Sequence, residues 1–176
     1  MLLPVVLALA ASCTALSILQ EGTKARQAFL IPYVYSFSPS GRPGAGNSPY
    51  CQLTFNVTDA ATNDDTQCKV QYGPCAWSGE RPPEMPKPDA PKPAKCQNED
   101  FKFWFSKFDS MRNFSLEITH TYHDKDTRSD VVHTGDSGWI NHDLSSDRGY
   151  SYTCGGSGVC SMGFRNNTDP LVATFK

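Results

Sequence analysis

The sequence has no excess of basic residues, no second long apolar segment and no stretch with a helical repeat. Its 16 Lys and Arg stand against 18 Asp and Glu, so the formal net charge is −2. A chain with this balance has no basic field to hold nucleic acid or an anionic membrane. After the first residues no segment provides the roughly 20 apolar residues of a membrane-spanning helix. The hydrophobic share of 39% excludes general disorder, and 176 residues suit one globular domain.

The chain opens with a short apolar run. Residues Leu2–Ala11 are apolar, and small residues follow them up to Ala15. A run of roughly 7 to 15 apolar residues before small residues is typical of a secretory signal peptide. We expect residues 1–15 to be that signal peptide, residues 16–27 a leader or flexible arm, and residues 28–176 one β domain. The predicted product is secreted and extracellular.

Cysteine usage indicates the same compartment. Removal of the signal peptide leaves six cysteines, an even number, which can pair in about 15 ways outside the cytosol. These cysteines are Cys51, Cys68, Cys75, Cys96, Cys154 and Cys160. The Gly-rich spacer between Cys154 and Cys160 favours a bridge between these two. No CxxC pair is present, which disfavours a structural zinc site.

A proline-rich segment lies between two of the cysteines. Residues 81–95 contain six prolines, which remove backbone donors and favour extended polyproline II structure. We expect a solvated, semi-rigid loop there; the alternative is a ligand for an aromatic groove on a partner. A bridge from Cys68 to Cys96 would close this loop and leave Cys51 for Cys75.

Three Asn-X-Ser/Thr triplets are candidate N-glycosylation sites on an exported chain. They begin at Asn56, Asn113 and Asn166. Asn56 and Asn113 fall in predicted strands, so we expect both side chains to point away from the core.

Alternation of apolar and polar residues predicts half-buried strands. In residues 113–122, Phe114, Leu116 and Ile118 would face inward and Ser115 outward. The other strand candidates are residues 28–37, 51–58, 68–72, 101–106, 130–133, 138–142, 150–153, 159–164 and 171–175. Turn residues separate these short runs. The pattern predicts an all-β fold, an antiparallel barrel or sandwich of about 8–11 short strands stapled by disulfides.

Five segments occur in a recognisable order: YVYSFSPSG, YCQLTFNVTDA, CQNEDFKFWF, NFSLEITHTY and GYSYTC. Over residues 28–164 this arrangement resembles the secreted fungal proteins grouped with the Alternaria major allergen. The resemblance implies a compact antiparallel barrel released by a filamentous fungus and linked to host interaction, immune recognition or allergenicity. That family has no agreed catalytic residues to carry over. The long insertion before Cys96 and the tail after Phe164 depart from its pattern.

Two segments approach catalytic or metal-binding motifs without matching them. Residues 155–159 read GGSGV, so Val159 replaces the last glycine of a nucleophile elbow, and we expect Ser157 at a hairpin tip. Residues 124–130 begin like a calcium loop, but Arg128 takes a ligand position. We expect a solvated acidic turn there.

The histidines and acidic residues do not form a recognisable catalytic set in the sequence. His120 lies on the apolar side of its predicted strand and is expected to be a hydrogen-bonded core or rim residue. His133 and His142 on neighbouring strands could share a metal ion. A glycosidase needs two carboxylates about 5 to 9.5 Å apart, whereas the acidic residues here fit their turns. We therefore predict no catalytic residue, no cofactor and no bound metal.

Aromatic side chains offer another route to ligands, because a ring face can stack on a sugar. The candidate contacts are Trp77, Trp104 and Trp139. For Trp104, which lies opposite the Phe face of its strand, we favour packing over ligand contact.

These features predict a non-enzymatic secreted protein, effector-like or allergen-like, that acts by surface recognition. Its partner would be an extracellular host protein or a cell-wall polysaccharide. Contacts are expected on loops 41–49, 81–95 and 124–136. The alternatives are a carbohydrate-binding module or cell-wall-active hydrolase, and an inhibitor of a host protease.

Overall fold

The computed structural model describes residues 27–39, 50–73, 94–141, 149–155 and 159–176. Several predicted features lie outside these residues: the signal peptide, residues 16–26 of the arm, residues 81–93 of the proline-rich loop, Cys75, Trp77, His142 and Ser157. Within the described part, no helix combines the length and the hydropathy that crossing a membrane would take.

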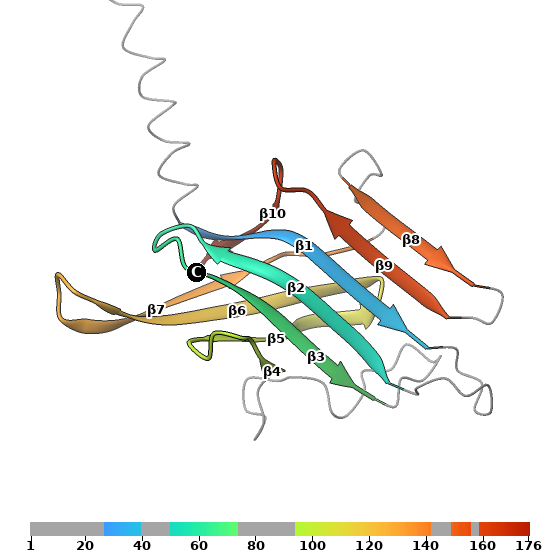
Figure 1. The fold of residues 1–176 in the computed structure, drawn as a ribbon, viewed down its shortest axis with the longest axis horizontal. Helices are drawn as coiled ribbons and strands as arrows, with labels where there is room; N and C mark the ends of the chain where they lie inside the picture. The colour runs from blue at the N-terminus through green and yellow to red at the C-terminus, as the bar shows by residue number, and fades with distance from the viewer. Residues whose placement is uncertain (1–26, 40–49, 74–93, 142–148, 156–158) are drawn as a thin grey trace, which may run out of the picture.

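The described residues form an all-β fold, as predicted. The strands are β1 (Ala28–Ser38), β2 (Cys51–Asp59), β3 (Asp65–Tyr72), β4 (Ala94–Lys95), β5 (Phe101–Ser110), β6 (Asn113–Asp124), β7 (Ser129–Asp136), β8 (Tyr150–Cys154), β9 (Cys160–Arg165) and β10 (Leu171–Phe175). Every pairing between them is antiparallel. In Figure 1, β1, β2, β3, β8 and β9 make the front layer, and β5, β6 and β7 run behind it.

The sheet curls into a nearly closed barrel with the strand order β3-β2-β1-β10-β7-β6-β5-β4. Its two ends meet where Cys68 of β3 forms an isolated bridge with Cys96, next to β4. β8 and β9 branch off this path, because β1 pairs with β10 through its first residues and with β9 through its last. The structure therefore has one interior, enclosed by two layers of strands.

The two predicted disulfides whose cysteines are both among the described residues are present. Cys68 and Cys96 are joined across the closure of the barrel, and Cys154 and Cys160 join β8 to β9. Cys51 is also disulfide-bonded.

The interior is filled by the inward side chains of the alternating runs. Phe55 and Phe103 reach it from the two layers and meet edge to face, with ring centroids 4.8 Å apart. The largest fully buried side chains are Tyr72, Phe29, Phe55, Phe101, Phe103, Phe105, Phe114 and Phe164. Burial of each such ring stabilises the fold by about 1.5 to 3 kcal/mol. Ser115, predicted to face outward, is instead buried, and its hydroxyl is satisfied there because it donates to Asp136 and accepts from Ser106.

An irregularity in β1 shifts the side-chain alternation of that strand. Between Leu30 and Tyr33, β1 contains one residue more than the stretch of β2 with which it pairs. Ile31 before the shift and Val34 after it are both fully buried. Pro32, which has no N–H to give to a strand ladder, lies inside this bulge.

Gly149 precedes β8 in a conformation that excludes a side chain. Its φ is +85°, and an added Cβ would lie 2.3 Å from the carbonyl oxygen of Arg165. We expect Gly149→Ala to lower the free energy of unfolding by about 2 to 5 kcal/mol, because the left-handed backbone and the steric overlap both contribute. Gly138 is the matched control, since its φ is +63° but no atom lies within 4 Å of an added Cβ. Gly138→Ala should lower the free energy of unfolding by about 1 to 2 kcal/mol, because only the strain of a left-handed backbone conformation is added. Urea unfolding compares the variants, and a smaller loss for Gly149→Ala would contradict the close contact.

Candidate functional site

A buried carboxylate joins two histidines at one end of the barrel. His120 of β6 and His133 of β7 lie opposite each other in the strand register, and Asp59 ends β2. Asp59 Oδ2 is 2.9 Å from His120 Nδ1 and 2.7 Å from His133 Nδ1, and Oδ1 accepts the Ala61 amide at 2.9 Å. We refer to Asp59, His120 and His133 as the Asp59 cluster.

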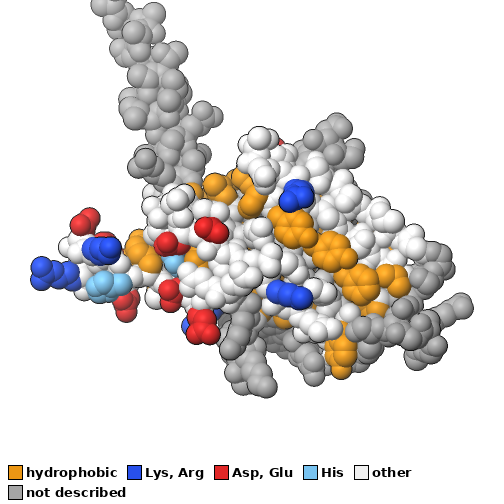
Figure 2. All heavy atoms as spheres, viewed as in Figure 1, with side chains coloured by type: hydrophobic (Ala, Val, Ile, Leu, Met, Phe, Trp, Pro, Cys, Tyr) orange, Lys and Arg blue, Asp and Glu red, His pale blue; other side chains and the backbone are white. Residues whose placement is uncertain are grey.

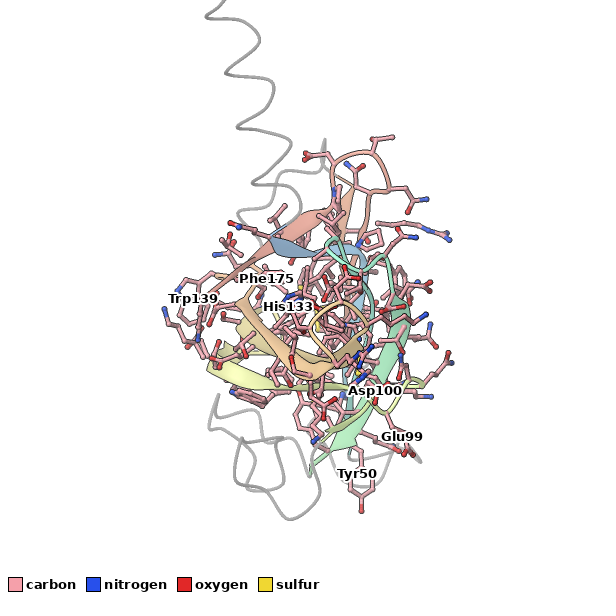
Figure 3. All side chains as sticks on the ribbon, turned by 90° about the vertical axis from the view of Figure 1, so that its left-hand side faces the viewer. Tyr50, Glu99, Asp100, His133, Trp139 and Phe175 are labelled. Carbon is pink, nitrogen blue, oxygen red and sulfur yellow. A yellow bond between two sulfur atoms is a disulfide. The ribbon has the colours of Figure 1, made fainter. Side chains whose placement is uncertain are left out.

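The Asp59 cluster is shielded from solvent. The side chain of Asp59 is 0% exposed and that of His120 2%. His120 stacks on Phe101 and His133 on Phe175, with ring centroids 4.0 and 4.4 Å apart; Figure 3 shows His133 and Phe175 side by side. Burial raises the pKa of Asp59, but hydrogen bonds from the two histidines and the Ala61 amide outweigh it and hold the pKa below 3.8. Each imidazole therefore donates from Nδ1 to a carboxylate.

The Nε2 atoms of the two imidazoles each face another polar side chain. Tyr122 Oη lies 3.4 Å from His133 Nε2, which outlines a carboxylate, imidazole and hydroxyl series like that of a hydrolase triad. Burial and the charges of Asp124 and Asp59 raise the pKa of the Tyr122 phenol, so this hydroxyl is harder to deprotonate than that of an ordinary tyrosine. His120 Nε2 faces Asp64 at 3.7 Å. The arrangement is a hydrogen-bonded tie between β2 and the β6–β7 hairpin.

The histidine predictions have different outcomes. His120 is a buried, hydrogen-bonded core residue, as expected. The residue that the fold brings next to His133 is His120, while His142 lies outside the described residues. Among the described residues, no group of three or more His, Cys, Asp or Glu side chains could hold a metal ion. Sequence reasoning missed Asp59, which looked like an ordinary turn residue.

The described tryptophans lie on the β5–β7 side of the barrel. Trp104 faces outward from β5, half-buried, opposite Glu117 of β6. Trp139 is 44% exposed, and Lys107 Nζ lies 5.7 Å from the centre of its ring. No ring contact between the two is found among the described residues.

Sequence reasoning also missed a row of aromatic side chains on the outside of β1. After the bulge, Tyr33, Tyr35 and Phe37 are half-buried and alternate with the buried Val34 and Ser36. We call these three residues the aromatic row. Figure 2 shows hydrophobic side chains in a line along β1 on this face of the molecule. The YVYSF alternation was visible in the sequence, but which side faces out depends on the bulge.

Polar side chains border the aromatic row on both sides. The register places the outward residues of β2, β3 and β9 beside it: Gln52, Thr54 and Asn56; Gln67, Lys69 and Gln71; Ser161, Gly163 and Arg165. Amide groups donate and accept hydrogen bonds, and hydroxyl groups do the same. The outer face of β9, β1, β2 and β3 thus combines apolar rings with groups of both hydrogen-bonding kinds.

A hollow of about 710 Å³ opens at one end of this face. Its lining includes five amide side chains, Asn56, Asn63, Gln67, Gln97 and Asn98. We call it the amide hollow. Asn56 lies directly opposite Tyr33 and accepts a hydrogen bond from Gln67 at 3.1 Å. The hollow and the aromatic row therefore form one continuous surface.

Comparison with known proteins gives no match. No protein-family model, no curated protein and no solved structure matches the chain significantly. The resemblance to the Alternaria allergen family stays a prediction, and the surface described above is the basis for any statement about function.

The glycosylation triplets are placed differently from one another. Asn56 lies on the outward side of β2, as expected. Asn113 is half-buried at the start of β6, and its side-chain amide donates to Asp109 at 3.3 Å. Asn166 Oδ1 accepts the amides of Thr168 and Asp169 in a tight turn. Glycan attachment at these sites stays a prediction.

The predicted contact loops are only partly described. Loop 41–49 lies outside the described residues. Of segment 124–136, residues 129–136 form β7 and only the turn before them is a loop, because the strand pairs with β6 along its length. Asp124 accepts the Asp126 amide at 2.9 Å in this exposed turn, in keeping with a solvated acidic turn.

Proposed function

We propose that this chain is a secreted, non-enzymatic recognition protein of the effector-like or allergen-like kind, which binds an extracellular partner through the outer face of β9, β1, β2 and β3. The observation that carries the proposal is the aromatic row. Disulfides between Cys68 and Cys96 and between Cys154 and Cys160 support an oxidising compartment for the protein.

The aromatic row is unusual for the outside of an antiparallel sheet. Side chains on a solvated face are normally polar. Three neighbouring rings on alternate positions form a strip about 13 Å long. Clustered apolar groups with a polar border are typical of a binding surface.

The scaffold presents this strip without reorganisation. β1 is hydrogen-bonded to β2 on one side and to β9 and β10 on the other. A side chain on a central strand loses little freedom on binding, which favours affinity.

Of the two partner classes, the amide hollow favours a polysaccharide over a protein. Five amides beside an aromatic strip can donate to and accept from sugar hydroxyls while a ring face packs on the apolar side of the sugar. This is the arrangement of a carbohydrate-binding surface.

The central residue of the row provides the test. We expect Tyr35→Ala to weaken binding to insoluble cell-wall polysaccharide roughly tenfold, because the central ring contact is lost. Binding is measured by depletion from solution over a range of protein concentrations, and circular dichroism checks the fold. Trp139→Ala is the matched control, since it removes an exposed ring elsewhere. Unchanged binding by Tyr35→Ala, or an equal loss in Trp139→Ala, would refute the proposed surface.

A further inference from the structure

We infer that the aromatic row and its border bind an anionic polysaccharide, a polyuronate, with its carboxylates against Lys69 and Arg165. This inference rests on the proposed function and names the class of ligand. The observation behind it is the position of two basic side chains on the two sides of the row.

Both basic residues lie beside the aromatic row. Arg165 of β9 is directly opposite Tyr33 in the strand register. Lys69 is one strand further out on the other side, since it pairs with Thr54, which pairs with Tyr35. With strands about 4.8 Å apart, the Lys69 backbone lies about 10 Å from that of Tyr35. Figure 2 shows basic side chains on both sides of the hydrophobic line along β1.

The charges of these two residues are not paired within the part of the chain that the structure describes. Both side chains are exposed, and no ion pair joins either of them to an acidic side chain of the described residues. The acidic residue on the same side of β3 is Asp65, four positions from Lys69 and therefore about 13 Å away along the strand. Among the described outward strand residues of this face, the basic ones thus lie on the two sides of the row and the acidic one, Asp65, lies at the amide hollow.

A polyuronate has three kinds of group that can contact this face: apolar ring faces, hydroxyls and carboxylates. Its sugar rings have apolar faces for Tyr33, Tyr35 and Phe37, and its hydroxyls suit the amides. Its carboxylates suit a guanidinium, which binds them through two parallel hydrogen bonds, and an ammonium group. The row exceeds the length of a single sugar ring, so a chain of repeating units is a better match than a free sugar acid.

An acidic peptide is the competing ligand, and it fits less well. It would satisfy Lys69 and Arg165 but would use neither the full length of the aromatic row nor the clustered amides. The net charge of −2 also gives the whole molecule no general attraction for polyanions. Recognition must therefore depend on local contacts.

The test measures binding of the disulfide-bonded protein to four polymers by isothermal titration calorimetry. The polymers are polygalacturonate, its fully methyl-esterified form, a neutral β-glucan and polyglutamate. The protein is produced in the bacterial periplasm, which allows disulfides and adds no glycan to Asn56. We expect polygalacturonate to bind at least about tenfold more tightly than the other three, with an affinity that falls as salt is added.

Paired substitutions then locate the effect. Lys69→Gln combined with Arg165→Gln should weaken polygalacturonate binding roughly five- to tenfold. The control is Lys102→Gln combined with Lys125→Gln, which removes the same charge from exposed positions on β5 and the β6–β7 turn and should change binding less than about twofold.

The outcomes separate the inference from the proposed function. Equal binding of the neutral glucan, with a loss in Tyr35→Ala, would overturn the choice of a polyuronate and leave the recognition surface standing. Equal binding of polyglutamate, or equal losses in the two paired variants, would also overturn the inference, since charge alone would then explain binding. If Tyr35→Ala binds every polymer as the unmodified protein does, the proposed function itself is wrong.

Discussion

Asp59→Ala is expected to lower the free energy of unfolding by about 3 to 5 kcal/mol. The side chain of Asp59 is fully buried and accepts from both Nδ1 atoms of the Asp59 cluster and from the Ala61 amide. Its removal leaves these donors without an acceptor in a site shielded from water. Urea unfolding monitored by fluorescence measures the loss.

Asp64→Ala is the control for this experiment. Asp64 lies 3.7 Å from His120 Nε2, but its side chain is 52% exposed, so we expect a cost below about 1 kcal/mol. Comparable losses in the two variants would show that burial of the Asp59 carboxylate contributes nothing special to the fold.

The same carboxylate gives stability a defined dependence on pH. The pKa of Asp59 is below its ordinary value of 3.8 in the folded protein. Its contribution is therefore fully present above pH 3.8 and is lost as the pH falls through the lowered pKa. The unmodified protein should lose stability more steeply than Asp59→Ala on acidification below about pH 4. Parallel curves for the two proteins would contradict a lowered pKa.

Removal of the Cys68–Cys96 bridge by a double alanine substitution should cost about 3 to 4 kcal/mol. The bridge spans 28 residues of sequence and joins the two ends of the strand path. Without it the unfolded chain gains the freedom of a long loop, and β4 can separate from β3. Thermal unfolding of the variant, compared with the unmodified protein, measures the loss.

The Cys154–Cys160 bridge provides an internal comparison, because it spans only 6 residues. Its removal should cost about 2 kcal/mol in the same loop-entropy account. A larger loss there than for Cys68–Cys96 would mean that loop length does not govern the contribution of these bridges.

Local sequence patterns predicted most of the strands and the Cys154–Cys160 bridge. The strand predicted over residues 138–142 is wrong: of its described residues only Ile140 is paired, in an isolated bridge with Phe114. Residues 51–58 and 113–122 alternate because one side of each strand is buried, and a period of two is visible without knowledge of the neighbours. The Gly-rich spacer between Cys154 and Cys160 likewise constrains only nearby residues.

Features that depend on contacts between residues far apart in the sequence could not be predicted. Asp59 is buried because β6 and β7 bring two histidines to it from more than 60 positions away in sequence. Ser115 is buried with its hydroxyl bonded to Asp136, a partner 21 positions away that the alternation within one strand does not reveal. The candidate binding surface was missed for the same reason, since it combines outward residues of four strands whose order is set by the whole barrel.

The single extra residue in β1 determines which amino acids this protein shows to its surroundings. Strict alternation from the buried Ile31 would send Tyr33, Tyr35 and Phe37 into the interior and expose Val34. Deletion of Pro32 would remove the extra residue and leave Tyr33, Tyr35 and Phe37 outward by simple alternation, so it is the bulge that lets β1 hold this extra residue without exchanging its faces. A one-residue deletion between Val34 and Phe37 would by contrast exchange inside and outside for the residues that follow it. Substitutions along the aromatic row leave this alternation unchanged.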